Sequence, residues 1–440
     1  MLNKKIKMNP KKKGIRRLQS KWFVFTFLLL MILAMLTAIF WPHVHKSVVQ
    51  TTTKTTEPIS LSVDAKSALV VDLNTGQIIA QKNSDKQVAI ASQSKMLVAY
   101  GVLKAIEEKK IKWNDQVTIP SNADLSSQNT SLYSHLNIKT GDKVSVKDLY
   151  TAMFEKSAND AAFALVTYLS GDSDKDQETL KSWAKQLNLT GSAWYNGAGQ
   201  KNGEAFDNEV NSASSSAYNH ASAIQVAQIA RKIIQMDPSL LKMTESTSLV
   251  YTKNSTTKVT DSSDFGTSFA SMVAGLNNPN NLQLLGLKTG STPESGASYT
   301  GIVKDQKGHL FLTVINGAAD YTDKTERFQK TIDMVNQVEE DSVAHDYEAG
   351  TVLKGASSLA IKDAKVKAKV QVAKTTTYWN TSKSRLSLLE TPVLSKKPSA
   401  SDTEVLAHVA VDFKGKYLPQ TSNSDKEIPL ELAGQAISNE

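Results

Sequence analysis

The chain has 440 residues, 40% of them hydrophobic and 21% charged, which is long enough for two globular domains and additional segments. It contains no cysteine, and this excludes disulfides, thiol catalysis and cysteine-ligated metal sites. The net charge of +8 comes from one end, because residues 1–56 hold 11 Lys and Arg and no acid, whereas the remainder holds 40 basic and 43 acidic residues. The bulk of the chain has no basic excess, so the sequence predicts no nucleic-acid partner.

An apolar run follows the basic N-terminus. Residues 22–41, WFVFTFLLLMILAMLTAIFW, carry no charge and match the thickness of a bilayer core, with Trp22 and Trp41 at their ends. The Lys and Arg in residues 1–21 favour a cytoplasmic location for that segment. We therefore expect 22–41 to be an uncleaved signal-anchor that crosses the lipid bilayer once; a cleaved signal peptide is the alternative.

Further along the chain, residues 42–60 are rich in threonine and predict a tether. Apolar runs on both sides of Asn74-Thr75-Gly76 predict a β-hairpin, and residues 199–217 and 252–265 predict polar loops. Helical periodicity predicts one helix that starts at Ser92 and others at 145–156, 161–171, 176–187, 221–236 and 325–339.

Strand patterns return from residue 282 and are connected as sequential hairpins, which implies an antiparallel sheet. Because strands occur at both ends of residues 61–342 and helices lie between them, we expect one shared sheet with an inserted helical lobe, an α+β fold. Residues 346–440 contain alternating segments such as VKAKVQV and predict a small C-terminal β-rich domain without helices.

The candidate nucleophiles are serine, threonine, lysine and the carboxylates, because cysteine is absent. The seven histidines occur in no triad-like context, and His309 is interpreted as structural. No histidine cluster, dinucleotide fingerprint or P-loop is present, so the sequence predicts no metal and no cofactor.

Ser92-Gln93-Ser94-Lys95 joins a small polar segment to an apolar helix. Ser92 and Lys95 are three residues apart and share one helical face, whereas Ser94 points elsewhere. Apolar surroundings and a second cation would favour a neutral lysine, which can take the proton of a serine nucleophile. By itself the motif is better explained by a capped helix with a snorkelling lysine, because serine and lysine are common residues.

Two further motifs follow in the chain. Residues 157–159 (SAN) lie between two predicted helices, and residues 288–290 (KTG) end a predicted strand. S-x-x-K, S-x-N and K-T-G in this order are the signature of penicillin-binding proteins and serine β-lactamases. A second KTG, at 139–141, precedes S-x-N and is interpreted as an ordinary turn.

Three longer blocks accompany these motifs: ALVVDLNTGQIIAQKNSDKQVAIASQSK, GDKVSVKDLYTAMFEKSANDAA and NHASAIQVAQIARKI. Together, the motifs and blocks resemble the low-molecular-mass penicillin-binding proteins. These are serine-type D-alanyl-D-alanine carboxypeptidases of the peptidase S11 kind. The resemblance implies their fold, an antiparallel sheet flanked by helices, with residues 61–342 as the D,D-peptidase domain and 346–440 as the β-domain that follows it.

The resemblance also implies roles for individual residues. Ser92 attacks the carbonyl of the penultimate D-alanine in a peptidoglycan pentapeptide, Lys95 takes its proton, and Ser157 relays a proton to the leaving D-alanine. The implied substrate-binding residues have separate roles. Asn159 contacts the substrate backbone, and Lys288 supplies positive potential. Thr289 and Arg327 lie at the site of the terminal carboxylate, Ser291 contributes to the oxyanion hole, and Gly290 belongs to the same set. For Arg327, a surface ion pair is an equal alternative.

The implied partners are peptidoglycan and β-lactam antibiotics, and the implied location is a bacterial, Gram-positive cell membrane with the catalytic domain outside. A β-lactamase or a D,D-transpeptidase of the same fold is the alternative, although no E-x-x-L-N segment lies between residues 160 and 200. A second alternative is a catalytically silent, membrane-tethered wall-binding protein. The intact motifs argue against this alternative. Residues 418–422, LPQTS, resemble a sortase signal but lack its glycine and its hydrophobic tail.

Overall fold

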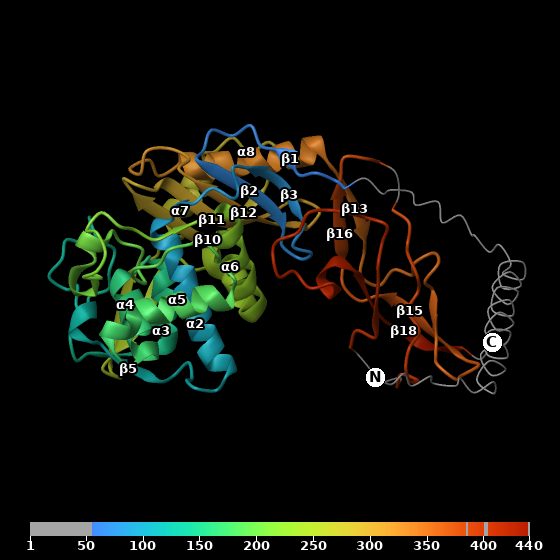
Figure 1. Cartoon of the computed structure of the whole chain (residues 1–440), viewed down its shortest axis with the longest axis horizontal. Helices are drawn as coiled ribbons and strands as arrows, with labels where there is room; N and C mark the ends of the chain where they lie inside the picture. Colours follow the sequence, from blue (N-terminus) through green and yellow to red (C-terminus); the bar gives the residue numbers. More distant parts are fainter. Residues whose placement is uncertain (1–54, 384–385, 400–403, 439–440) are drawn as a thin grey trace, which may run out of the picture. The chain divides into compact units, whose positions relative to one another are not determined.

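The computed structural model describes residues 55–383, 386–399 and 404–438 (Figure 1). The signal-anchor expected at 22–41 and most of the tether lie outside the described residues. Within the described part of the chain, no helix is both long enough and apolar enough to cross a membrane.

A six-stranded sheet forms the centre of the larger domain, and both ends of that domain contribute to it as expected. Its order is β1-β3-β2-β12-β11-β10. The pairs are antiparallel except for β1 and β3, which are parallel. The strands are β1 Ile59–Ser60, β2 Ser67–Asp72, β3 Ile78–Lys82, β10 Gln283–Thr292, β11 Gly296–Lys304 and β12 Leu310–Asn316.

Helices cover both faces of this sheet, so its inner strands are buried on both sides. α8 (Glu326–Asp341) packs against β11 and β12, and α6 (Ala223–Met236) packs against β12 and β2 (Figure 1). The two helices match the segments predicted at 325–339 and 221–236. Every residue of β2 is buried, which explains its unbroken apolar run.

A helical lobe is inserted between β3 and β10, as predicted. Its other helices are α2 Lys95–Glu107, α3 Val146–Glu155, α4 Asn159–Ser170, α5 Asp176–Gln186 and α7 Thr267–Ala274. Helix α2 is buried on nearly all sides because its sequence is apolar around the whole circumference. Ser145 caps α3 by accepting from the backbone N–H of Asp148, and the Asp148 carboxylate accepts from the backbone N–H of Thr252.

One sequence prediction in this region was wrong. Residues 252–265 were expected to be a loop, but β8 (Ser248–Lys253) and β9 (Thr257–Ser262) form a hairpin. The hairpin extends the small sheet of β5 (Gln116–Thr118) and β6 (Lys143–Ser145). Strand β9 is mostly exposed and has no apolar face, so its sequence carries no strand signal and its partner β8 supplies the buried side chains.

The end of the expected tether is part of the fold. Ile59 and Ser60 pair with β3, and Thr56 donates its backbone N–H to the carbonyl of Lys414 at 2.7 Å. A threonine-rich composition predicts flexibility, but backbone pairing does not depend on side-chain type, so composition could not locate this strand.

The C-terminal β-domain contains two small sheets and its own hydrophobic cluster. The sheet of β14, β15, β18 and β17 follows the alternation predicted for VKAKVQV, with the apolar residues buried and the lysines exposed. The strands are β13 Val343–Tyr347, β14 Ser358–Ala360, β15 Lys367–Val372, β16 Thr376–Asn380, β17 Ala407–Val409 and β18 Ile428–Ser438. No α-helix occurs in the described residues after 342, in agreement with the sequence.

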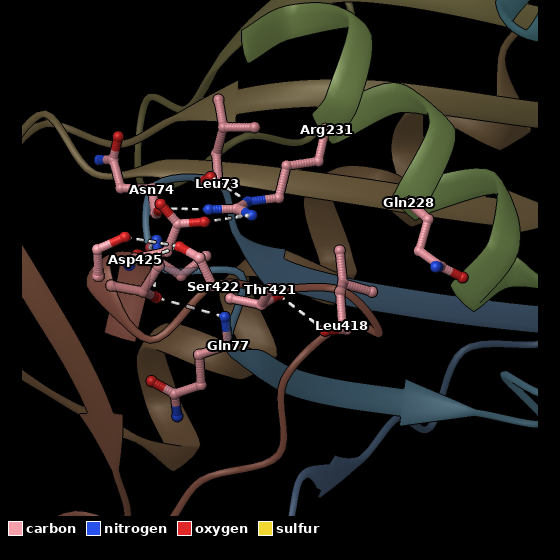
Figure 2. A network of polar contacts seen from close by, with 12 residues as sticks. Leu73, Asn74, Gln77, Gln228, Arg231, Leu418, Thr421, Ser422 and Asp425 are labelled. Atoms are coloured by element: carbon pink, nitrogen blue, oxygen red, sulfur yellow. Dashed lines mark hydrogen bonds and ion pairs between the residues drawn. The ribbon is translucent and has the colours of Figure 1, made fainter. Parts of the chain in front are cut away.

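The β2–β3 turn, residues 72–77, contacts the C-terminal segment 415–425 through polar groups (Figure 2). Arg231 of α6 donates to the carbonyls of Leu73 and Asn74 and forms an ion pair with Asp425 at 3.2 Å. The LPQTS residues are part of this joint, since the backbone N–H of Leu418 donates to the carbonyl of Gly76. They are therefore structural in this fold.

Candidate active site

The S-x-x-K motif begins with one turn of 3-10 helix, η1 (Ala91–Ser94), which leads directly into α2. Ala91 has a left-handed backbone, φ 45°, and this turns the chain sharply at the start of the motif. The Ser92 Oγ and Lys95 Nζ atoms are 2.9 Å apart, as the three-residue spacing predicts. Ser94 lies on the other side and accepts from Asn219 Nδ2 at 2.9 Å, so the preference for Ser92 over Ser94 agrees with the geometry.

Lys95 is completely buried without a carboxylate in contact. Its Nζ donates to Asn159 Oδ1 at 2.7 Å and to the carbonyl of Ala198 at 2.9 Å. Burial lowers the pKa of Lys95 well below its usual range, and the positive charge of Lys288 lowers it further. Both effects were expected from the sequence.

The polar contacts around this lysine can all be made by a neutral amine, the form that its lowered pKa favours. Two N–H groups are needed for Asn159 and Ala198, whose oxygens can act as acceptors and not as donors. A neutral amine then keeps one lone pair, and the remaining neighbour is the Ser92 hydroxyl, which can donate. In the neutral form the lone pair of Lys95 therefore faces the Ser92 hydroxyl.

The S-x-N motif lies in the tight connection between α3 and α4. Ser157 has φ 56° and is 8% exposed, and within the described chain it makes no hydrogen bond to Lys95 or Lys288. Its relay role therefore stays a prediction. Asn159 begins α4, and its side-chain N–H groups have no partner among the described residues, which leaves them free for a ligand.

K-T-G lies on β10, the edge strand beside η1. Lys288 is 1% exposed, and burial lowers its pKa to about 8, although Asp264 acts in the opposite direction. A Cβ on Gly290 would lie 2.8 Å from the carbonyl oxygen of Ile90, so the close approach of strand and turn requires a glycine here. The other KTG, at 139–141, is a turn before β6, as interpreted.

Arg327 is buried, 3% exposed, at the start of α8. Its guanidinium donates to the carbonyls of Gly290 and Ser298, to Ser291 Oγ and to the carbonyl of Asp323. Burial lowers its pKa to about 10, which leaves it charged at neutral pH. The alternative of a surface ion pair is therefore wrong, and the arginine places a buried positive charge behind β10.

Thr289 and Ser291 flank Gly290 on this strand. Thr289 is half-buried, and Ser291 is exposed with its Oγ held by Arg327 at 2.8 Å. The structure thus brings together both ends of the site, with the S-x-x-K turn packed on β10 and Asn159 in contact with Lys95.

Sequence reasoning missed the loop at residues 196–199, which supplies the Ala198 carbonyl to Lys95. Gly199 has φ 79°, and a Cβ there would lie 1.9 Å from the carbonyl oxygen of Ala91. Asn196 Oδ1 holds the loop by accepting from the backbone N–H of Gly199. Gly199 thus permits close packing of this loop against the S-x-x-K turn.

The site's chemistry comes from serine, lysine and amide groups. Among the described residues, no group of three or more His, Cys, Asp or Glu is arranged to hold a metal ion. Asp160, next to Asn159, is fully buried; its carboxylate accepts the backbone N–H of Leu136 and Ala161, and burial raises its pKa to about 8. It was also missed, because nothing in the sequence marks it as different from other acidic residues near a helix start.

A serine beside a buried lysine, with a second lysine on the edge strand of an α+β sheet, belongs to the penicillin-binding protein and serine β-lactamase class of fold. A family model of D-alanyl-D-alanine carboxypeptidases, peptidase S11, matches residues 51–319, which is more than half of the chain. The chain belongs to this family.

Curated relatives agree with this assignment. D-alanyl-D-alanine carboxypeptidase DacD of Salmonella typhimurium is 27% identical over 272 residues, covering 62% of each chain. DacC of Escherichia coli is 35% identical over 131 residues, covering 29% of this chain and 32% of that protein. The chain thus spans about a third to three fifths of the length of these curated relatives.

Two crystal structures share the fold. PBP3 from Streptococcus pneumoniae, described as a peptidoglycan synthesis regulatory factor, has a TM-score of 0.68 at 21% identity and covers 85% of this chain and 99% of its own. Penicillin binding protein 5 from Haemophilus influenzae has a TM-score of 0.56 at 19% identity and covers 86% and 98%.

Proposed function

We propose that this protein is a serine D,D-carboxypeptidase that removes the terminal D-alanine from peptidoglycan stem peptides and is acylated by β-lactams. The observation that carries this proposal is the Ser92–Lys95 contact at 2.9 Å, in which the lysine is buried and its N–H groups are used by Asn159 and Ala198. A buried lysine with a lowered pKa can act as the base for the serine.

The reaction proceeds through an ester. Ser92 Oγ attacks the carbonyl carbon of the penultimate D-alanine while its proton passes to Lys95. The bond to the nitrogen of the terminal D-alanine then breaks, and that nitrogen receives a proton through Ser157. Water hydrolyses the ester and regenerates Ser92, so the net change is the hydrolysis of one peptide bond.

Substrate binding uses β10 on one side and Asn159 on the other. The free side-chain N–H groups of Asn159 bind the peptide backbone, and the N–H groups of Ser92 and Ser291 bind the developing oxyanion. Lys288 and Thr289 attract the terminal carboxylate. The buried charge of Arg327 reaches the carboxylate through the Ser291 hydroxyl, to which it donates.

The location follows from the sequence. Residues 22–41 would hold the protein in the cell membrane by a single pass, with residues 61–342 as the D,D-peptidase domain outside and residues 346–440 as a separate β-domain. The support for this proposal is the charge distribution around the apolar run and the separate hydrophobic cluster of the C-terminal residues. The Gram-positive assignment stays a prediction.

Labelled penicillin and a pentapeptide that ends in D-Ala-D-Ala test the function in the full-length chain. We expect a stable covalent label and release of D-alanine at a rate that falls when the enzyme is labelled first. The absence of a label would refute the serine acyl-enzyme. Rapid turnover of penicillin would favour a β-lactamase, and transfer of the peptide to an added amine without hydrolysis would favour a transpeptidase.

A further inference from the structure

The turn that carries the nucleophile is attached to the sheet by a side chain of the S-x-x-K motif itself. Gln93, the residue after Ser92, donates from its side-chain amide to the Oγ1 atom of Thr300 at 2.8 Å. Both partners are buried, with exposed fractions of 1% and 0%. They are 207 residues apart in the chain, so this hydrogen bond ties η1 directly to strand β11.

Thr300 occupies a defined place in the sheet. It is the cross-strand partner of Lys288 on β10, and side chains of directly paired residues project to the same face. The preceding residue, Tyr299, packs against Phe328 of α8. Because side chains alternate along a strand, Thr300 projects to the face opposite α8. Gln93 is therefore anchored beside the K-T-G motif, one strand further into the sheet.

The Gln93 side chain also passes close to the glycine of K-T-G. A Cβ on Gly290 would lie 3.6 Å from the Gln93 Cγ atom and 2.8 Å from the carbonyl oxygen of Ile90. The oxyanion hole of the proposed reaction consists of the backbone N–H groups of Ser92, on the turn, and Ser291, on the strand. The separation of these two N–H groups depends on how the turn is held against the sheet.

Stability alone does not explain an amide at this position. The Gln93 Oε1 atom is buried and has no hydrogen-bond partner among the residues that the structure describes. An unpaired buried oxygen is unfavourable, and replacement of both partners of a buried hydrogen bond by apolar groups of similar shape is close to neutral. Two aliphatic side chains would thus fill the same space without loss of stability. A directed hydrogen bond, in contrast, restrains both the distance and the orientation of the turn.

We propose that Gln93 is a positioning residue for acyl transfer, whose hydrogen bond to Thr300 holds the backbone N–H of Ser92 at the distance from β10 that the oxyanion requires. The inference rests on the proposed carboxypeptidase function. When Ser92 Oγ bonds to the carbonyl carbon, its proton passes to Lys95 and the carbonyl oxygen takes the π electron pair. Because this oxygen gains its charge only during the reaction, a loosened turn should lower kcat and leave KM nearly unchanged.

Variants of the threonine test the proposal in the full-length enzyme. Thr300→Val removes the hydroxyl and keeps the volume, so we expect kcat for D-alanine release from a pentapeptide to fall about tenfold, with KM within about twofold of wild type. Thr300→Ser keeps the hydroxyl and should restore most of kcat. A peptide boronic acid, whose boron forms a tetrahedral adduct with Ser92, should bind about tenfold more weakly to Thr300→Val.

A double variant separates positioning from stability. Gln93→Leu combined with Thr300→Val replaces both polar groups by apolar ones, so its urea midpoint should equal or exceed that of wild type while kcat stays low. Because the two side chains act through one hydrogen bond, the double variant should lose no more activity than Thr300→Val alone.

Thr313→Val is the matched control. It removes a buried hydroxyl of the neighbouring strand β12, which donates to the carbonyl of Gly301 at 3.1 Å, and kcat should stay at the wild-type value. A wild-type kcat or boronic acid affinity in Thr300→Val would overturn the proposal, as would a rise in KM at constant kcat. An equal loss of kcat in Thr313→Val would also overturn it. Absence of D-alanine release and of a penicillin label in the wild-type enzyme would instead refute the proposed function.

Discussion

Buried cations occur in two regions of this protein, and their surroundings are opposite. Lys95 and Lys288 lie in the active site without a carboxylate in contact, and burial lowers the pKa of each. At the joint with the C-terminal domain, Arg231 pairs with Asp425, and His309 contacts Asp305 at 2.5 Å and Asp346 at 2.9 Å. Burial opposes the charge of His309, but the two carboxylates outweigh it and raise its pKa to about 9.

The difference shows that the desolvation of a buried cation has different consequences in the two regions. Removing a cation from water is unfavourable in both regions. Around Lys95 and Lys288 the nearby carboxylates only partly offset that cost, so burial still lowers the pKa of both lysines. At the joint carboxylates contact the cations directly, and Figure 2 shows the pair of Arg231 and Asp425 between α6 and the C-terminal segment. The predictions below alter one or the other environment.

Removing the nucleophile should have the largest effect. We expect Ser92→Ala to abolish covalent penicillin labelling and to lower kcat for D-alanine release by about 10⁴-fold or more, since the ester can no longer form. Ser94→Ala is the matched control, because the Ser94 hydroxyl contacts Asn219 and not Lys95. Covalent labelling of the Ser92 variant by mass spectrometry would contradict the assignment.

Replacing the base should rank second. Lys95→Met removes the amine without leaving a charge in the buried position, so we expect a folded protein whose acylation rate falls about 10³-fold. Lys104→Met, on the same helix but partly exposed and paired with Glu108, should acylate normally. Stopped-flow acylation by penicillin measures both, and a similar rate in the two variants would remove Lys95 from the mechanism.

A substitution at the joint with the C-terminal domain should lower the free energy of unfolding and leave the acylation rate unchanged. His309→Gln leaves two carboxylates without their cation, and we expect it to lower the free energy of unfolding by about 3 kcal/mol. Because the folded pKa of His309 lies above its usual 6.5, its contribution is complete below about pH 6.5 and is lost as the pH rises through about 9. Urea unfolding at several pH values measures this, with His345→Gln as control; a pH-independent difference between variant and wild type would contradict it.

The pH profile of acylation tests the lysine pair. The rate should rise with pH as Lys95 loses its proton and fall above about pH 8 as Lys288 becomes neutral. In Lys288→Gln the positive charge that lowers the pKa of Lys95 is absent, so the rising limb should move to higher pH and the falling limb should disappear. The exposed Lys324→Gln should keep the wild-type profile, and an unmoved rising limb in Lys288→Gln would show that the lysines are not coupled.

The smallest effect is expected at the rim of the joint. Asp425 is partly exposed, so Asp425→Asn should cost only about 0.5 kcal/mol of stability, and added salt should reduce the difference. Asp363→Asn, in the same domain and exposed, serves as the control in the same unfolding measurement. A loss of several kcal/mol would mean that the Arg231 ion pair resembles the His309 site more than a surface pair.

The three motifs S-x-x-K, S-x-N and K-T-G could be found in the sequence because each is local. The spacing of Ser92 and Lys95 fixes their relative position through one helical turn, and the small residues of K-T-G suit an edge strand. Helices α5, α6 and α8 were predicted almost to the residue, since long amphipathic periods are strong signals. The hairpin of β8 and β9 was not, because its exposed strand has no apolar face.

The sequence alone was sufficient to predict the α+β class, the proximity of Ser92 and Lys95, and a separate C-terminal β-region. The tertiary structure decided which groups surround them: the Ala198 carbonyl that uses one N–H of Lys95, the burial of Arg327 behind β10, and the carboxylates that keep His309 charged. These contacts join residues that lie tens to hundreds of positions apart, and their energies depend on burial and distance. Neither burial nor distance can be predicted from the local spacing of residues, so the chemistry of each lysine and histidine depends on the fold.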